Sequence, residues 1–194
     1  MYREQAPDED PPAVRWLPFQ LNPDLPEEGI AREEYLERKY GRGASRDHSH
    51  LIGIGKELGI DFAFDKIAVQ PNTLAAHRLQ IYAARLERED QVAESLFRAY
   101  FQEGAAIADP AVLADIGERA GLERAAVETY LASGQDRDTV LRADIEARNA
   151  GINGVPFFIF NRRIAVSGAH EPATLLQAMK EAIEDGAASR PLPP

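Results

Sequence analysis

The chain has 194 residues, of which 44% are hydrophobic and 28% charged, with a formal net charge of −10 and no cysteine. This composition suits a single soluble domain, or a core fold with a large insertion. The acidic charge argues against nucleic acid as a partner, because phosphates need a basic face. No apolar run reaches the roughly eighteen residues of a membrane-spanning helix, so we expect no membrane either. Residues 1–12 also lack the apolar core of a secretory signal.

The first predicted element is a strand over residues 13–19, which are rich in aromatic and β-branched side chains. Pro18 places the end of this strand at an edge or an exit. Two prolines then make residues 22–26 a rigid, non-helical connector, because each proline disfavours the α conformation in the residue before it.

From Ala31 to about Gly134 the pattern becomes helical. Apolar side chains recur every three to four residues, and glycines or prolines separate the segments. Asp109 is expected to cap one helix, which begins at Pro110 and ends at Gly121, and Asn72 is expected to cap another. The stretch from Asp61 to Gln70 is ambiguous. The expected helices cover residues 32–40, 46–58, 73–88, 91–103, 110–120, 123–132 and 136–150.

A β-hairpin follows the helical region. Pro156 opens the apolar run 157–160, a polar turn occupies 161–163, and a second apolar run leads to Gly168. Alternation puts Phe157 and Ile159 on one face of the first strand, and helices are expected to cover both faces. A last helix begins at Glu171–Pro172, and residues 186–194 read as a tail. Two separated strand regions predict one small mixed sheet, whose halves a long helical insertion brings together.

Four segments, taken in order, resemble the FrnE-type branch of the DsbA-like family. They run from Arg-Trp-Leu-Pro-Phe-Gln at residues 15–20, through Pro-Asn-Thr-Leu at 71–74 and Leu-Phe-Arg-Ala-Tyr-Phe at 96–101, to Gly-Val-Pro-Phe-Phe at 154–158. The resemblance covers residues 13 to 180. It implies an α/β, thioredoxin-like fold with a small mixed sheet, interrupted by a large helical insertion. Residues 1–30 and 136–185 would form an incomplete thioredoxin-like domain, 31–135 the insertion and 186–194 a tail.

The activity that this resemblance implies is thiol–disulfide exchange through a C-x-x-C pair just after the first strand. This sequence has no such pair, and residues 1–5 resemble the tail of the helix that carries it in the family. We therefore expect a chain that is truncated at its N-terminus relative to the family. As a cysteine-free polypeptide it would be inactive in disulfide exchange, because exchange requires a thiolate.

The resemblance also implies a binding site. A cis peptide bond between Val155 and Pro156 would hold the Val155 backbone exposed for an extended substrate. Val155 and Pro156 are thus the expected substrate-binding residues, with no catalytic residue, no cofactor and no metal. The expected partner is an extended peptide or a thiol- or disulfide-bearing protein. A homodimer is a further expectation, and the expected location is the cytoplasm.

Two alternatives remain open at this point. The zero cysteine count, taken literally, fits a noncatalytic peptide-binding module with a thioredoxin-like fold. Asn72–Thr73 is also reminiscent of glutathione-dependent isomerases and transferases related to 2-hydroxychromene-2-carboxylate isomerase, which need a serine or cysteine nucleophile after the first strand. The histidines show no metal-ligand spacing; they are His48, His50, His77 and His170.

Overall fold

The computed structural model describes residues 12–43 and 47–188, with the backbone alone described for 184–188. The chain divides into two compact units, Trp16–Ile145 and a second one made of Met1–Arg15 with Glu146–Pro194. We call the first the helical unit and the second the hairpin unit. The boundary falls within helix α8. The expected division at 30/31 and 135/136 rests on the family's domain pattern rather than on compactness, and it stays a prediction.

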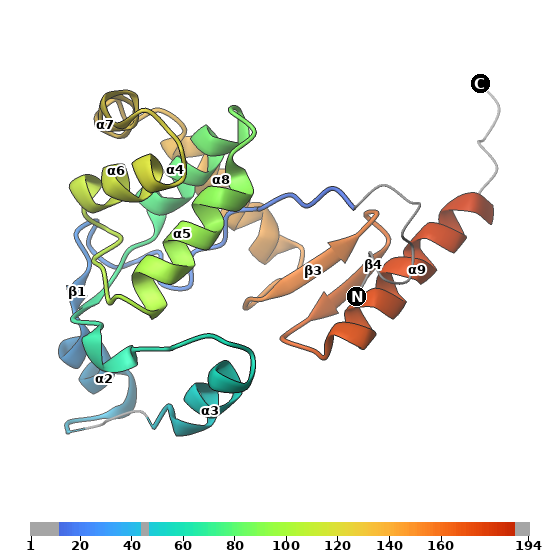
Figure 1. The fold of residues 1–194 in the computed structure, drawn as a ribbon, viewed down its shortest axis with the longest axis horizontal. Helices are drawn as coiled ribbons and strands as arrows, with labels where there is room; N and C mark the ends of the chain where they lie inside the picture. Colours follow the sequence, from blue (N-terminus) through green and yellow to red (C-terminus); the bar gives the residue numbers. More distant parts are fainter. Residues whose placement is uncertain (1–11, 44–46, 189–194) are drawn as a thin grey trace. The chain divides into compact units, whose positions relative to one another are not determined.

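The helical unit is built from short helices that the sequence pattern places well (Figure 1). Helix α2 occupies the nine residues expected for it, and Asp109 caps α6 by accepting a hydrogen bond from the Ala111 N–H at 2.8 Å. The elements in order are β1 (Ile30–Ala31), α2 (Arg32–Tyr40), α3 (Ser49–Glu57), η1 (Phe64–Lys66), β2 (Val69–Gln70), α4 (Leu74–Ala84), α5 (Glu89–Phe101), α6 (Pro110–Arg119), α7 (Arg124–Ala132) and α8 (Arg137–Asn149).

The prediction of a strand over residues 13–19 is wrong, because none of these residues belongs to a strand in the structure. Here backbone polar groups contact side chains of helices instead of pairing with a neighbouring strand. The His77 ring Nε2 lies 3.1 Å from the Phe19 carbonyl oxygen, and the Gln20 N–H donates to Asp144 Oδ1 at 2.8 Å. The Asn72 side chain likewise binds this extended segment, because its amide donates a hydrogen bond to the Leu25 carbonyl at 2.8 Å. Tertiary contacts have therefore overridden the local strand preference.

The sheets also differ from the single mixed sheet that was expected. Among the described residues there are two separate two-stranded antiparallel sheets, one joining β1 to β2 and one joining β3 (Phe157–Phe160) to β4 (Ile164–Ser167). One strand of the first sheet, β2, lies at the end of the stretch that the sequence left ambiguous, and it pairs with β1. Gly29 precedes it with a φ of +81°, and a Cβ there would lie 2.5 Å from the Gln70 carbonyl oxygen. That turn consequently requires glycine.

The core of the helical unit lies where α4, α5, α6 and α7 meet. Its most deeply buried side chains have no exposed surface, and each contributes roughly 1.5–3 kcal/mol by leaving water. They include Leu79, Val92, Leu113, Ile116 and Val127.

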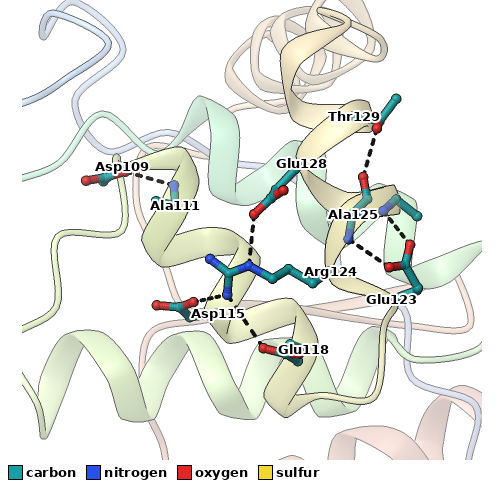
Figure 2. A network of polar contacts seen from close by, with 10 residues as sticks. Asp109, Ala111, Asp115, Glu118, Glu123, Arg124, Ala125, Glu128 and Thr129 are labelled. Atoms are coloured by element: carbon teal, nitrogen blue, oxygen red, sulfur yellow. Dashed lines mark hydrogen bonds and ion pairs between the residues drawn. The ribbon is translucent and has the colours of Figure 1, made fainter.

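Polar contacts at the surface join α6 to α7 (Figure 2). Arg124 contacts Asp115 and lies 3.5 Å from Glu118, both on α6, while it also binds Glu128 one turn further along α7. Glu123 caps α7 by accepting from the Ala125 and Ala126 N–H groups. Because these ion pairs are exposed to water, charge attraction contributes little to the stability of the fold. We assign their main role to positioning the start of α7 against α6.

The hairpin unit contains β3, β4 and helix α9 (Pro172–Ala188), which runs alongside β4 in Figure 1. The register pairs Phe158 with Val166 and Phe160 with Ile164, so these four side chains share one face and all are partly buried. The helix includes the first three residues of the expected tail, 186–188. The predictions for residues 1–5, for residue 46 and for the tail beyond 188 lie outside the described residues.

A first prediction concerns the core. Leu79→Ala should lower the free energy of unfolding by about 2–5 kcal/mol, because it removes buried methyl groups and leaves a cavity among four helices. Urea denaturation followed by circular dichroism measures this change. Leu58→Ala is the matched control: that side chain is 70% exposed, so its removal should change stability by less than about 0.5 kcal/mol. Equal effects of the two substitutions would contradict this account of the core.

Candidate functional site

The candidate site lies at the start of the hairpin, where α8 has ended and β3 has not yet begun. The peptide bond between Val155 and Pro156 is cis. The Val155 side chain is 47% exposed, and its backbone makes no hydrogen bond with any residue in the described ranges. Pro156 instead faces β4, because its carbonyl oxygen accepts from the Gly168 N–H at 2.9 Å.

The bond from Gly168 to Pro156 fixes which backbone groups of β3 point away from β4. In an antiparallel pair, residues alternate between facing the partner strand and facing outward. Pro156, Phe158 and Phe160 therefore face β4. Val155, Phe157 and Ile159 direct their N–H and C=O groups to the opposite edge, which we call the outer edge of β3. Within the described residues no strand pairs with this edge.

The same alternation gives the hairpin two unlike faces. Phe158 and Phe160 stack with ring centroids 6.4 Å apart on the face turned to α9. On the other face Ile159 is 49% exposed, and its cross-strand partner Ala165 is exposed as well. The expectation that helices cover both faces is therefore wrong for the described residues. The outer edge of β3 thus adjoins an apolar face that is open to solvent.

The other residues that the sequence singled out have structural roles in the helical unit. Asn72 is buried; its Oδ1 accepts from the Leu74 N–H at 2.9 Å and from Gln20 Nε2 at 3.0 Å. It thus binds the first turn of α4, although the N-cap position expected for it is occupied by Thr73. The His77 ring contacts the Phe19 carbonyl, and the rings of His48 and Phe64 stack with their centroids 4.2 Å apart. The four histidines do not come together, and no group of metal-ligating side chains was found in the described part of the chain.

The helical unit also has a hollow of about 540 Å³ beside α4, lined by Leu74, Arg78, Leu131 and Arg137 among others. Its charged side chains already have partners within the protein. Arg78 donates to the carbonyls of Tyr130, Leu131 and Gln135, so it caps the end of α7, while Arg137 pairs with Glu27 at 2.6 Å. These contacts make the hollow part of the fold rather than a binding site. No helix in the described ranges is both long enough and apolar enough to cross a membrane.

Comparison with known proteins places this architecture in a family. The family model for the DSBA-like thioredoxin domain matches residues 2–180. The chain therefore belongs to the DSBA-like thioredoxin family and has its fold, a mixed α/β architecture with mostly helical content and small sheets.

Two of the matching proteins illustrate this similarity. The crystal structure of a probable DsbA oxidoreductase, SCO1869 from Streptomyces coelicolor, superposes with a TM-score of 0.77 at 25% identity, over 91% of this chain and 76% of that one. An uncharacterized protein of Bacillus subtilis strain 168, YwbO, is 25% identical over 157 residues, which are 80% of this chain and 76% of the relative.

The geometry adds functional groups that the sequence did not reveal. Proline before an apolar run indicates where β3 begins, so Val155 and Pro156 could be proposed from sequence together with the resemblance. The outward-facing backbone of Phe157 and Ile159 could not, because it depends on the register with β4. A period-2 pattern shows which residues share a face, but not which face a helix covers.

A second prediction follows from His77. Burial removes water from its ring and lowers its pKa below the usual value of about 6.5, against smaller opposing effects of the Phe19 carbonyl and Asp144. The unfolded chain then binds the proton more readily. The free energy of unfolding therefore has its full value above about pH 6.5, and it falls as the pH drops from there through the lower, folded-state pKa. Urea midpoints between about pH 7.5 and 5.5 measure it.

His77→Gln supplies the control for this prediction. The glutamine amide can still donate to the Phe19 carbonyl, but it does not titrate in this range. The variant should therefore show a flatter dependence of stability on pH than the unaltered chain. Identical slopes for the two proteins would mean that His77 is not the group that titrates.

Proposed function

We propose that this protein is a chain of the thiol–disulfide oxidoreductase type, of the FrnE-like branch, whose hairpin unit binds the extended substrate. The observation that carries the proposal is the exposed Val155 before Pro156, whose backbone makes no hydrogen bond within the described residues, in a chain of the DSBA-like family. The 194-residue polypeptide contains no cysteine, so we propose that by itself it binds substrate without exchanging disulfides.

The binding mode that we propose is strand addition. An extended peptide has unpaired N–H and C=O groups on each edge, and the Val155 backbone offers complementary groups. Backbone bonds of this kind tolerate many sequences, which suits a protein that acts on varied substrates.

The zero cysteine count favours a second candidate, a noncatalytic module that uses the same Val155 backbone. The DNA upstream of the Met1 codon separates the two. An in-frame strand pattern followed by a C-x-x-C codon pair would support the oxidoreductase, whereas an in-frame stop codon next to Met1 would support the module. From the family resemblance we also propose a cytoplasmic location and a thiol- or disulfide-bearing protein as partner.

A third prediction concerns activity. The polypeptide of 194 residues should not accelerate the reduction of insulin by dithiothreitol, because exchange proceeds through a protein thiolate that this chain cannot supply. Turbidity measures the reaction, with a C-x-x-C-containing member of the family as positive control. Catalysis above the rate with dithiothreitol alone would refute the thiol-based mechanism for this chain.

A fourth prediction tests the Val155 backbone. Val155→Pro removes an N–H that has no partner within the described residues, and so should weaken the binding of an extended peptide of about ten residues by roughly fivefold or more. Fluorescence anisotropy with a labelled peptide measures the affinity.

Ala165→Pro is the matched control, since Ala165 lies in β4 and directs its N–H to the edge of the hairpin beyond β4. This variant should bind the peptide as the unaltered chain does. If both substitutions weaken binding equally, the peptide does not pair with the Val155 backbone.

A further inference from the structure

The loop between α8 and β3 contains an asparagine followed by glycine, Asn153–Gly154. This pair is typical of a two-residue hairpin turn. The hairpin turn lies elsewhere, however, at Asn161 and Arg162, whose φ values are +52° and +59°. Residues 153 and 154 lie outside every helix and strand. The Asn153 side chain is exposed, and its amide donates to the Gly151 carbonyl at 3.1 Å, a hydrogen bond that water can readily replace.

The backbone nitrogen of Gly154 is equally unconstrained. Its N–H makes no hydrogen bond with any residue in the described ranges. A Cβ at Gly154 would have no other atom within 4 Å, so the space beside this nitrogen is open. The Gly154 nitrogen is therefore free to approach the carboxamide of the residue before it, and no side chain of its own stands in the way.

We propose that Asn153 is a modification site, at which the Gly154 nitrogen closes a succinimide ring on the side chain and so converts asparagine to aspartate or isoaspartate. Base removes the Gly154 N–H proton, and the nitrogen attacks Cγ of Asn153. The bond from Gly154 N to Cγ forms, the Cγ–Nδ2 bond breaks, and the side-chain nitrogen leaves as ammonia. Water then opens the ring. Its attack at Cγ gives aspartate, whereas its attack at the main-chain carbonyl carbon gives isoaspartate.

Two further exposed asparagines, Asn149 and Asn161, lack this combination. After Asn149 the attacking nitrogen is occupied, because the Ala150 N–H donates to the Glu146 carbonyl at 3.0 Å. Breaking such a bond costs about 1 kcal/mol, which slows a reaction roughly fivefold. After Asn161 the nitrogen belongs to Arg162, whose side chain crowds the approach that glycine leaves open. The structure thus singles out Asn153 among the exposed asparagines of the described chain.

Conversion changes both charge and geometry beside Val155. From Ala147 to His170 the chain has no aspartate and no glutamate, so the product carboxylate is the first negative charge in this segment. Isoaspartate also lengthens the main chain by one atom, with Gly154 alone between it and Val155. If the proposed function holds, an extended peptide that pairs with the Val155 backbone should bind less tightly after conversion.

The test is to incubate the full chain over days in neutral and in mildly alkaline buffer, and to map the products by tandem mass spectrometry. Trypsin cuts after Arg148 and Arg162, so residues 149–162 form one peptide that holds all three exposed asparagines. Asn153 should convert roughly fivefold or more faster than the other two, and faster in the alkaline buffer. Equal rates at the three positions would overturn the proposal.

Gly154→Ala is the matched variant. The φ of Gly154 is not positive and its Cβ position is open, so alanine should leave the fold intact. The added methyl group crowds the attacking nitrogen, so conversion of Asn153 should slow by roughly fivefold or more. Asn149→Gln is the control and should leave the rate at Asn153 unchanged. If Gly154→Ala keeps its circular dichroism spectrum and Asn153 still converts at the original rate, Gly154 is not the nucleophile and the proposal is wrong.

Peptide binding is measured separately, by anisotropy, on converted chain isolated by anion exchange. The converted chain should bind the labelled peptide roughly fivefold or more weakly than fresh chain. Equal binding by the two would overturn the claimed effect on Val155. If fresh chain binds no peptide, the proposed function fails, whereas mass spectrometry still decides whether Asn153 is the modification site.

Discussion

The constraint on which the helical unit depends is that backbone polar groups in its extended segment need partners once they are buried. No ladder supplies them there. The Phe19 carbonyl lies within hydrogen-bond distance of His77, and the Gln20 N–H donates to Asp144, so α4 and α8 are joined through one strand-like segment. Asn72 connects this segment to the start of α4. Polar side chains are buried here because the backbone requires them, which accounts for their place beside an otherwise apolar core.

This requirement also explains how much of the fold was predictable. Helices depend on local periodicity and on caps, so α2 and the Asp109 cap of α6 could be located from sequence alone. A strand depends on a partner that can be far away in the chain. Residues 13–19 have a strand composition. The sequence does not show that His77 contacts Phe19 or that Asp144 binds Gln20. The β1–β2 pair was missed for the converse reason, because two residues on each side give no pattern.

The hairpin shows the same division between local and tertiary information. Pro156, the polar turn and Gly168 mark its limits, and the structure confirms the two strands between them. Which edge and which face remain open depends on where β4 and α9 lie, and these positions follow from packing. Arg162 is a sharper case: Asn161 indicates a turn, yet only the backbone angle at Arg162 shows that the turn favours a glycine in its place.

In the 194-residue polypeptide the outer edge of β3, which no described strand pairs with, also affects association between molecules. Two copies of the chain could pair through the same edge, because unpaired strands are templates for one another. Mutual repulsion between molecules of net charge −10 opposes this at low ionic strength. Added salt shortens the range of that repulsion but leaves the short-range attraction between apolar faces in place. The protein should therefore be most dispersed in dilute buffer, and its tendency to self-associate should rise with ionic strength.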